Sequence, residues 1–567
     1  MPRNRDRRAT PGSRQPGVEI NPLFKEAGVE KELHEVELQH AAPLFDIDAY
    51  VDDFNRSVLP AYRRGQADAE QPADIGLARS VIPPGTAAAR DFSTLAITIP
   101  EFSSGACVGC MACVNACPDA AVLAVALPES EARDRIAAFA NDDDDAATLE
   151  AHFAMTTKYG KVPARKGLEP ALFGIFIDPV HCKGCAECVD VCHALGYDAL
   201  RMIQKQPATD TAPSTLERYE RDMRFFRSLP PTPGPYRSEK ALADIMLHDD
   251  AFGYVGGAGS CSGCGEATAI RMLIAATRQT YGPHGMGIIA ATGCNTVYGS
   301  TYPYNPFLVS WTNSLFENAP AVAMGVRLRW DQEGHPERRL WVLGGDGAMF
   351  DIGFQSLSRM VASGKDIKVM ILDTQAYSNT GGQASTASFR GQVTKLSAYG
   401  HQLQGRPEAR KELGRIIMAH GDVYVAQVTT ANINHFYRAV LDANDYPGPA
   451  VIIVHTPCQP EHGIPDDASQ RQSALAVESR AFPVFTYDPR RGPTMAQRLS
   501  LNGNPHIRED WSRRSDGTIV DFIAFARTEG RFAPHFGPSG EVTPELQLAQ
   551  EERLHNWRAL KEMAGLL

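Results

Sequence analysis

The stretch RLWVLGGDGAMFDIGFQSLSRMVASGKDIKVMILDT, residues 339–374, predicts two buried strands joined by a helix. Short apolar runs open and close it, and the segment between them has the spacing of an amphipathic helix. The same alternation returns at 423–456, where VYVAQVT and AVIIVHT enclose the helical pattern INHFYRAVLDAND. Strands that alternate with helices form a parallel sheet covered on both faces. We therefore expect an α/β fold with a doubly wound parallel sheet, whose ligands bind beyond the carboxyl ends of the strands.

The composition favours a large globular protein. The chain has 567 residues, 43% of them hydrophobic, which is enough to build several domains. Its net charge of −11 argues against a nucleic-acid partner, because such proteins need clustered lysine and arginine. No apolar run approaches the roughly 20 residues of a membrane span, and the basic opening lacks the apolar centre of a secretory signal. We expect a cytoplasmic protein without a membrane span, in which the opening is a disordered tail; a transit peptide is the alternative.

Eight of the twelve cysteines form two quartets with the spacing C-x2-C-x2-C-x3-C. This spacing is typical of two-cluster ferredoxins, in which the fourth cysteine of each quartet binds the other [4Fe-4S] cluster. Disulfides are not favoured in a large chain without an export signal. Zinc is the alternative metal, although zinc sites usually use two separated C-x2-C pairs. The predicted sets are Cys107, Cys110, Cys113 and Cys192 for one cluster, and Cys182, Cys185, Cys188 and Cys117 for the other.

A second site is predicted at the strand ends of the quoted stretch. The segment GGDGAMFDIG at 344–353 has glycines that let backbone amides approach a diphosphate at the start of a helix. The loop DTQAYSNTGGQAS begins at Asp373, where the next strand ends. Neighbouring strand ends would bring together the Asp346 carboxylate, the Thr374 hydroxyl group and the Ala376 carbonyl group, which are the oxygen ligands that Mg2+ prefers. A tight turn without a ligand is the alternative.

Taken together, these motifs resemble the carboxy-terminal half of pyruvate:ferredoxin oxidoreductase, a thiamine-diphosphate and iron–sulfur enzyme. The similarity runs from about residue 80 to residue 490. Besides both cysteine quartets, it includes PPGTAAARDF, SCSGCGEA, ATGCNTVYGS, WTNSLFENA, GDGAMFDIG, YSNTGGQAS and HTPC. The YSNTGGQ loop resembles the pyruvate branch of the 2-oxoacid:ferredoxin oxidoreductase superfamily more than the 2-oxoglutarate branch.

The resemblance implies a thiamine-diphosphate-binding fold for the sheet and a third [4Fe-4S] cluster beside the thiamine. Its thiolates would be Cys261, Cys264, Cys294 and Cys458, for which structural zinc is the alternative. Two catalytic residues are implied: Glu266, in contact with the thiamine, and Asn379, facing the substrate. Without the motifs they would be a helix-start carboxylate and a turn asparagine. The implied cofactor-binding residues are Glu266, Cys294, Gly345, Asp346, Gly347, Ala348, Thr374, Ala376, Tyr377, Ser378 and Asn379.

The implied activity is oxidative decarboxylation of pyruvate with coenzyme A to acetyl-CoA and CO2, with three clusters passing electrons to ferredoxin or flavodoxin. The same chemistry on 2-oxoglutarate or another 2-oxoacid is one alternative, and an electron-transfer subunit without its own catalysis is another. A non-redox thiamine decarboxylase would leave the cysteines unexplained. The family's pyrimidine-binding domain is not recognisable here, so we expect a β-type subunit that pairs with an α-type chain in a dimer of heterodimers.

Five segments are predicted from these patterns. They are an irregular N-terminal arm at 1–95, a ferredoxin-like α+β domain with two clusters at 96–205, a linker at 206–249, the thiamine-diphosphate-binding domain with its proximal cluster at 250–485, and a C-terminal extension for subunit contact at 486–567. Within the arm, DAYVDDFNRSVLPAYRRG is a possible helix that ends at Gly65.

Overall fold

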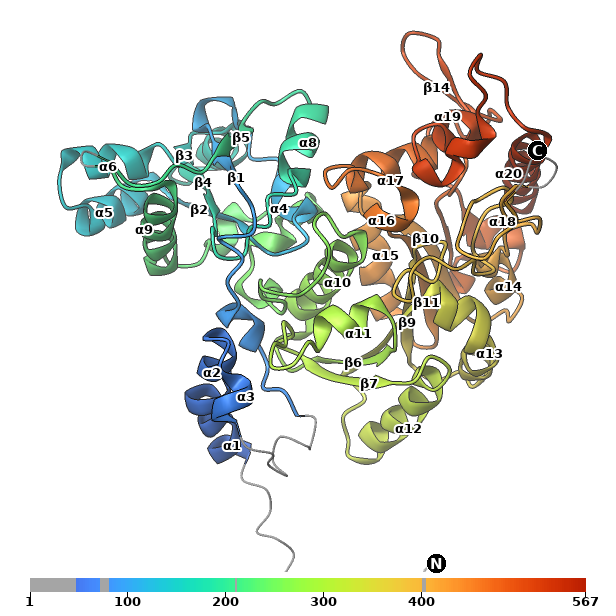
Figure 1. Ribbon diagram of the computed structural model, residues 1–567, viewed down its shortest axis with the longest axis horizontal. Helices are drawn as coiled ribbons and strands as arrows, with labels where there is room; N and C mark the ends of the chain where they lie inside the picture. The colour runs from blue at the N-terminus through green and yellow to red at the C-terminus, as the bar shows by residue number, and fades with distance from the viewer. Residues whose placement is uncertain (1–46, 72–80, 210–211, 400–403) are drawn as a thin grey trace, which may run out of the picture.

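The computed structural model describes residues 47–71, 81–209, 212–399 and 404–567 (Figure 1). Its largest element is an eight-stranded sheet in the order β13-β12-β10-β11-β9-β8-β6-β7. The strands from β10 to β7 run parallel to one another, whereas β12 pairs antiparallel with both of its neighbours, β10 and β13. The predicted parallel sheet is confirmed. The bounds are β6 Met286–Ala291, β7 Ser310–Ser314, β8 Arg339–Gly345, β9 Lys368–Asp373, β10 Tyr424–Thr429, β11 Ala450–His455, β12 Phe485–Tyr487 and β13 Leu499–Ser500.

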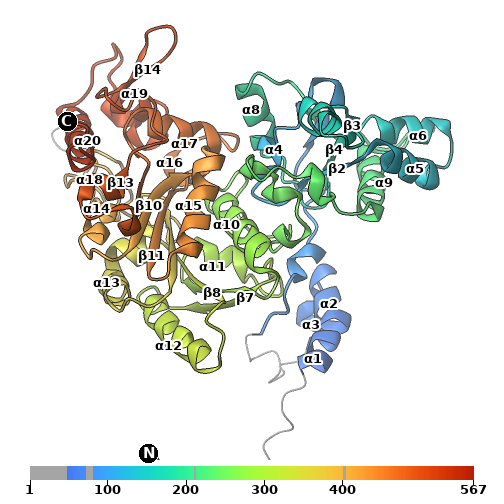
Figure 2. The ribbon, with the colours of Figure 1, turned by 180° about the vertical axis from the view of Figure 1, so that it is seen from behind.

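Helices cover both faces of this sheet, as Figures 1 and 2 show. Alternate residues of a strand enter different cores: Met370 and Leu372 of β9 lie in one, and Val369 and Ile371 lie in the other. The first core includes α10 Gly265–Tyr281 and α15 Ile433–Asp445. The second includes α12 Ala319–Gln332, α13 Phe354–Ala362, α14 Leu413–Met418 and α20 Pro544–Met563. Because both faces are buried, the strands read as continuous apolar runs.

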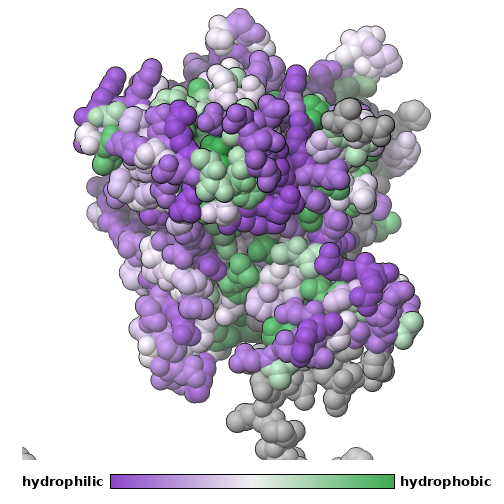
Figure 3. Space-filling model, turned by 90° about the vertical axis from the view of Figure 1, so that its left-hand side faces the viewer, coloured by the Kyte–Doolittle hydropathy of each residue, from purple (hydrophilic) through white to green (hydrophobic). Residues whose placement is uncertain are grey.

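The ferredoxin-like part lies beside the sheet, at the left of Figure 1 and the right of Figure 2. It contains the antiparallel pair β1 Thr98–Phe102 and β5 Leu200–Gln204. The third cysteine of each quartet lies on a short helix, α4 Ala112–Ala116 or α8 Glu187–Ala194. A second sheet in the order β2-β4-β3 comprises Val122–Pro128, Ala171–Ile177 and Phe153–Ala154. It packs with α5 Glu129–Phe139 and α9 Thr215–Ser228. The face that carries this part is mostly hydrophilic, with hydrophobic residues in a hollow near its middle (Figure 3).

The segment 206–249, expected to be a linker, is folded against its neighbours. Helix α9 begins with a capping box in which Ser214 and Glu217 bond each other's backbone amides. Its Tyr219 donates a 2.9 Å hydrogen bond to the Pro100 carbonyl group, and Phe225 is fully buried. The prediction of a linker was wrong because it relied on composition, which is rich in Pro and Arg. The buried residues of α9 follow the helical period, but they are too few to stand out in that composition.

The C-terminal boundary at residue 485 also needs correction. Strands β12 and β13 extend the main sheet, and α20 places the fully buried Trp557 in its second core. These strands have three and two residues, which is too short for an alternation pattern to predict them. Subunit contact by this segment stays a prediction. The elements α17 Ser469–Glu478, α18 Met495–Arg498, β14 Ser512–Arg513, β15 Ile519–Val520 and α19 Phe522–Ala526 complete this region.

The predicted N-terminal helix is confirmed in the range 47–63, as α1 Ile47–Asp53, a π-helical turn and α2 Leu59–Arg63. It ends before Gly65, which has a φ of 67°. The predicted tail, together with the rest of 1–46, lies outside the described residues. In the parts of the chain that the structure describes, no helix is both long and apolar enough for a membrane span.

Candidate functional site

A cavity of about 280 Å3 lies at the carboxyl ends of β6, β8 and β9. Every predicted cofactor-binding residue lines it: Glu266, Cys294, Gly345, Asp346, Gly347, Ala348, Thr374, Ala376, Tyr377, Ser378 and Asn379. The wall also includes Thr292, Gly293, Phe316, Ile352 and Thr380, which the sequence did not single out. The topology explains this convergence, because parallel strands present their following loops at one edge of the sheet.

Three of these residues form an oxygen-rich corner of the cavity. The Thr374 hydroxyl group is 3.1 Å from an Asp346 carboxylate oxygen and 3.0 Å from the Ala376 carbonyl oxygen. Asp346 is 1% exposed, and burial followed by the charge of Asp373 raises its pKa well above the usual range. A buried carboxylate, a hydroxyl group and a carbonyl group within reach of one another are a donor set that fits Mg2+.

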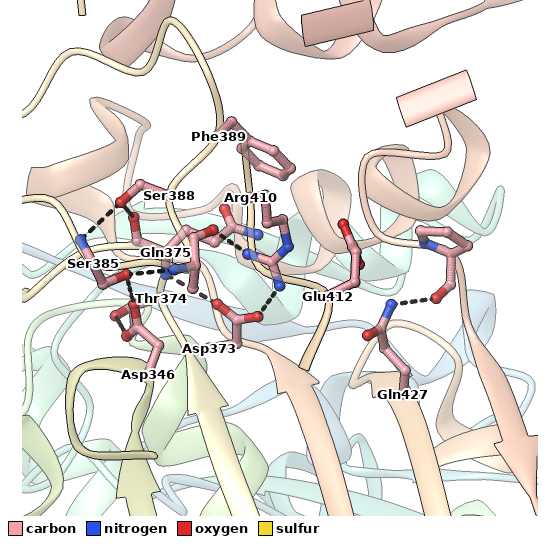
Figure 4. Close-up of polar contacts among 12 residues, drawn as sticks. Asp346, Asp373, Thr374, Gln375, Ser385, Ser388, Phe389, Arg410, Glu412 and Gln427 are labelled. Atoms are coloured by element: carbon pink, nitrogen blue, oxygen red, sulfur yellow. Dashed lines mark hydrogen bonds and ion pairs between the residues drawn. The ribbon is translucent and has the colours of Figure 1, made fainter. Parts of the chain in front are cut away.

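Two serines support this corner, and only Ser378 was among the predicted residues. Ser385 donates a short hydrogen bond to the second carboxylate oxygen of Asp346 (Figure 4). Ser378, predicted only to line the cofactor site, donates to the Thr374 hydroxyl group at 2.7 Å. Both lie in the loop that follows β9, so their place in the YSNTGGQAS motif was the available signal. Which hydroxyl group faces Asp346 depends on how the loop folds.

The residue between Thr374 and Ala376 turns the chain so that both oxygens face one point. Gln375 has a φ of 57°, a left-handed conformation that is costly outside glycine. Its amide group bonds Asp373, its carbonyl oxygen accepts hydrogen bonds from Ser388 and Gln392, and its side chain accepts one from Arg531 at 2.7 Å. Figure 4 shows Asp373 and Ser388 beside Gln375. The network therefore holds the strained backbone in place.

An ion pair below this turn stabilises the end of β9. Arg410 forms a short ion pair with the fully buried Asp373 (Figure 4). Behind the loop, His462 contacts the Thr374 carbonyl oxygen at 2.8 Å. His462 belongs to α16 Gln459–His462, which directly follows Cys458. His462 thus connects the oxygen-rich corner directly to the loop that carries Cys458.

Glu266 also lines the cavity, from the first turn of α10. Its carboxyl group is 3.5 Å from the Tyr298 hydroxyl group, and burial raises its pKa to about 8. Burial, followed by the charge of Glu266, also raises the pKa of Cys294. A carboxyl group that favours its protonated form at neutral pH can donate a hydrogen bond to a ligand. Asn379, by contrast, is exposed, although it lines the same cavity.

The four remaining thiols converge beside Glu266. Cys264 ends the loop before α10, and its pKa is raised by burial, by Glu266 and by the nearby Cys458 and Cys261. Two glycines allow this approach. A Cβ atom at Gly263, whose φ is 71°, would lie 1.9 Å from the Asp466 carbonyl oxygen, and one at Gly265 would lie 2.8 Å from Pro457. Small residues surround these cysteines because the loop that carries Cys458 packs directly on them.

Each cysteine quartet contributes to two separate small cavities. One is lined by Cys107, Cys110, Cys113 and Cys192, together with apolar residues such as Phe102 and Ile175. The other is lined by Cys117, Cys182, Cys185 and Cys188. The fourth cysteine of each quartet lies with the three of the other quartet, which is the crossed arrangement expected from ferredoxin spacing.

Comparisons with known proteins agree with this geometry. Residues 276–454 match the family model described as thiamine pyrophosphate enzyme, C-terminal TPP binding domain, and residues 100–123 match the 4Fe-4S binding domain. The probable pyruvate-flavodoxin oxidoreductase of Escherichia coli (strain K12) is 30% identical to the chain, over 80% of the chain and 41% of that relative. The chain is therefore similar to one part of the pyruvate-flavodoxin oxidoreductases and matches their thiamine and cluster domain types.

Two pyruvate oxidoreductases from other organisms show the same partial correspondence. The pyruvate-flavodoxin oxidoreductase of Rhodospirillum rubrum is 27% identical over 93% of the chain and 46% of that relative. The pyruvate:ferredoxin oxidoreductase of Moorella thermoacetica is 28% identical over 70% of the chain and 37% of that relative. The chain thus spans less than half the length of these relatives. The family matches support thiamine pyrophosphate and iron–sulfur clusters as its cofactors.

Proposed function

We propose that this chain is the thiamine- and cluster-binding part of an enzyme that oxidatively decarboxylates a 2-oxoacid. The observation that carries the proposal is that Cys294 and Glu266 share one cavity with Asp346 and Thr374. One thiol of the proposed cluster set and the oxygen set for Mg2+ therefore open onto the same space. A pure electron-transfer subunit needs no such cavity, and a non-redox decarboxylase needs no such thiols.

The proposed roles follow from the chemistry of each residue. When bound, thiamine diphosphate supplies the nucleophilic carbon and the electron sink for decarboxylation. Asp346, Thr374 and the Ala376 carbonyl group would hold Mg2+, and the backbone from Gly345 to Ala348 would face the diphosphate. Glu266, buried and with a pKa raised to about 8, would present a proton at its carboxyl group. Asn379, exposed on the cavity wall, would contact the substrate.

The cysteines would carry electrons away from this cavity. Cys261, Cys264, Cys294 and Cys458 would hold a proximal [4Fe-4S] cluster, and the two crossed sets would hold the others, giving three clusters per chain. Pyruvate is the proposed substrate because the chain's relatives are named for it, with coenzyme A as acyl acceptor and ferredoxin or flavodoxin as electron acceptor. Oxidation releases two electrons, which the clusters take up singly.

The proposed enzyme needs a pyrimidine-binding region in addition to these residues. We expected a separate α-type subunit and a dimer of heterodimers. The relatives are single chains more than twice as long as the part that matches, so the comparisons do not favour a separate subunit. Co-purification from the native source distinguishes a second polypeptide from a longer single chain. A residence in the cytoplasm also remains part of the proposal.

Anaerobic purification followed by cofactor analysis tests the proposal. We expect about twelve iron atoms per chain, four for each cluster. We also expect Mg2+-dependent thiamine diphosphate binding, and bleaching of the visible cluster absorption by pyruvate once the pyrimidine-binding region is present.

Asp346→Asn should weaken the Mg2+-dependent binding of thiamine diphosphate by more than about 100-fold, because even supporting residues of metal sites contribute 10–100-fold. Asp351→Asn is the matched control. Asp351 bonds Tyr377 and Thr386 in the loop that follows β9, but it is not part of the oxygen-rich corner. Equal losses in both variants would contradict the assignment of Asp346.

A further inference from the structure

A buried arginine without a carboxylate partner among the described residues contacts the helix that carries Cys113. Arg271 is 4% exposed and belongs to α10, the helix that begins directly after Cys264. One guanidinium nitrogen donates to the carbonyl groups of Val114 and Asn115, and another is 3.6 Å from the Met246 sulfur atom. Among the described residues, Arg271 has no ion pair, and its Nε atom has no hydrogen-bond partner.

Burial of such a charge is costly unless an anion compensates it. Burial raises the pKa of the Cys117 thiol, and the charge of Arg271 opposes this increase. Val114 and Asn115 belong to α4 and lie between Cys113 and Cys117 along the chain. The charge of Arg271 therefore faces the point where the two crossed cysteine sets meet.

The other charges around Cys117 are paired or more distant. Asp119 raises the pKa of Cys117, but it forms a 2.6 Å ion pair with Lys183, and both side chains are buried. Lys183 is bound further by the carbonyl oxygens of Ala258 and Ser260. Burial raises the pKa of Cys182, and the charge of Lys205 opposes this increase. The Lys205 amino group donates to the Ser93 carbonyl group. Arg271 is thus the buried cation near Cys117 that no carboxylate neutralises within the described chain.

We propose that Arg271 is the fixed counter-charge of the cluster held by Cys117, Cys182, Cys185 and Cys188, and that it raises the reduction potential of this cluster. The inference rests on the proposed function, because it requires that these thiols hold a cluster. A cluster with four thiolates is anionic and gains a further negative charge on reduction, so a nearby cation favours the reduced form. Its role is electrostatic, and it acts on the transfer of electrons away from the thiamine cavity.

The alternative role of Arg271 is purely structural, as a cap for the last carbonyl groups of α4. The same helix offers a matched control. Arg278 is 7% exposed and donates to the carbonyl groups of Asp250 and Leu308 at 2.8 Å, neither of which belongs to a cysteine quartet. Both arginines therefore bond backbone carbonyl groups, and Arg271 is the one whose contacts lie beside a cysteine quartet.

Redox titration of the cluster-loaded full chain, followed by electron paramagnetic resonance, tests the proposal. In Arg271→Gln, which keeps hydrogen-bond donors but removes the charge, one cluster midpoint should fall by about 59 mV, a tenfold change for one electron. Arg271→Lys should keep the midpoint, and Arg278→Gln should leave all midpoints unchanged. Equal midpoints in Arg271→Gln and Arg278→Gln would overturn the proposal.

A second pair of variants covers a failure of Arg271→Gln to assemble its clusters. Met246→Glu places a carboxylate beside the guanidinium group, and Met246→Gln is its neutral match. The proposal expects a lower midpoint in Met246→Glu than in Met246→Gln, and equal midpoints contradict it. Iron content and the wild-type spectrum separate the two levels of inference: a wild-type chain that takes up no cluster refutes the proposed function itself, whereas loaded clusters with unshifted midpoints refute only the role of Arg271.

Discussion

The Ser378 hydroxyl group donates a 2.7 Å hydrogen bond to the Thr374 hydroxyl group. Ser378 also forms a hydrogen bond with Cys458, which lowers the otherwise raised pKa of that thiol. One serine therefore contacts both the oxygen corner of the cavity and a thiol of the proposed proximal cluster. The two predicted cofactor sites are joined through a single side chain.

Ser378→Ala should weaken Mg2+-dependent thiamine diphosphate binding by about fivefold, since one hydrogen bond contributes about 1 kcal/mol. Calorimetric titration of the anaerobically prepared chain measures this affinity. Ser363→Ala is the control, because that hydroxyl group bonds only the Met360 carbonyl group and the Lys365 amide at the end of α13. An unchanged affinity for thiamine diphosphate in Ser378→Ala would show that Ser378 does not support the oxygen-rich corner.

Cys458→Ser should lower the iron content by about four atoms per chain, because one [4Fe-4S] cluster loses a ligand. Cys107→Ser should lower it by the same amount through a different cluster. The two variants should differ in the thiamine cavity, where only Cys458→Ser disturbs a partner of Ser378. Thiamine diphosphate affinity distinguishes them, and equal affinities would show that Cys458 does not act on the cavity.

Gly263→Ala should impair assembly of the proximal cluster. The left-handed backbone alone costs about 1–2 kcal/mol, and the added Cβ atom would lie 1.9 Å from the Asp466 carbonyl oxygen. Gly364→Ala has a similar φ of 68° with no atom within 4 Å, so it measures the backbone cost separately. Denaturant unfolding and iron analysis compare the two variants. The interpretation fails if they lose equal stability and neither loses iron.

His435 should make stability depend on pH below neutrality. Burial lowers the pKa of His435 from 6.5 to about 4, and both ring nitrogens are buried without hydrogen bonds. Between these values the unfolded chain binds more protons, so the free energy of unfolding decreases as pH falls from 6.5 to 4. His435→Leu should remove this contribution, which is at most about 3 kcal/mol.

Denaturant unfolding of the wild type and His435→Leu at several pH values measures this contribution. The difference between the two free energies should be constant above pH 6.5 and should change only below it. The exposed His284, replaced by glutamine, controls for the loss of any histidine. A difference that does not vary with pH would show that His435 keeps the same protonation in both states.

Much of the architecture could be predicted from periodicity. The helix pattern at 433–445 and the apolar runs at 423–429 and 450–456 correspond to α15, β10 and β11. Their amphipathic or apolar spacing extends over whole elements, which makes them reliable signals. Segment 206–249 was misjudged because its composition masks α9, and the short β12 and β13 gave no pattern.

The sequence by itself determined the chemistry: the two thiol quartets, the oxygen donors near residues 346 and 374, and the alternation that builds a parallel sheet. Ligand type and local spacing are properties of the chain and can be read directly. Only the tertiary structure decided that Ser385 bonds Asp346, that Ser378 contacts Cys458, and that Arg271 lies buried beside Cys117. These partners are separated along the chain by up to 154 residues or come from different elements, so the packing of helices and loops on the sheet brings them together.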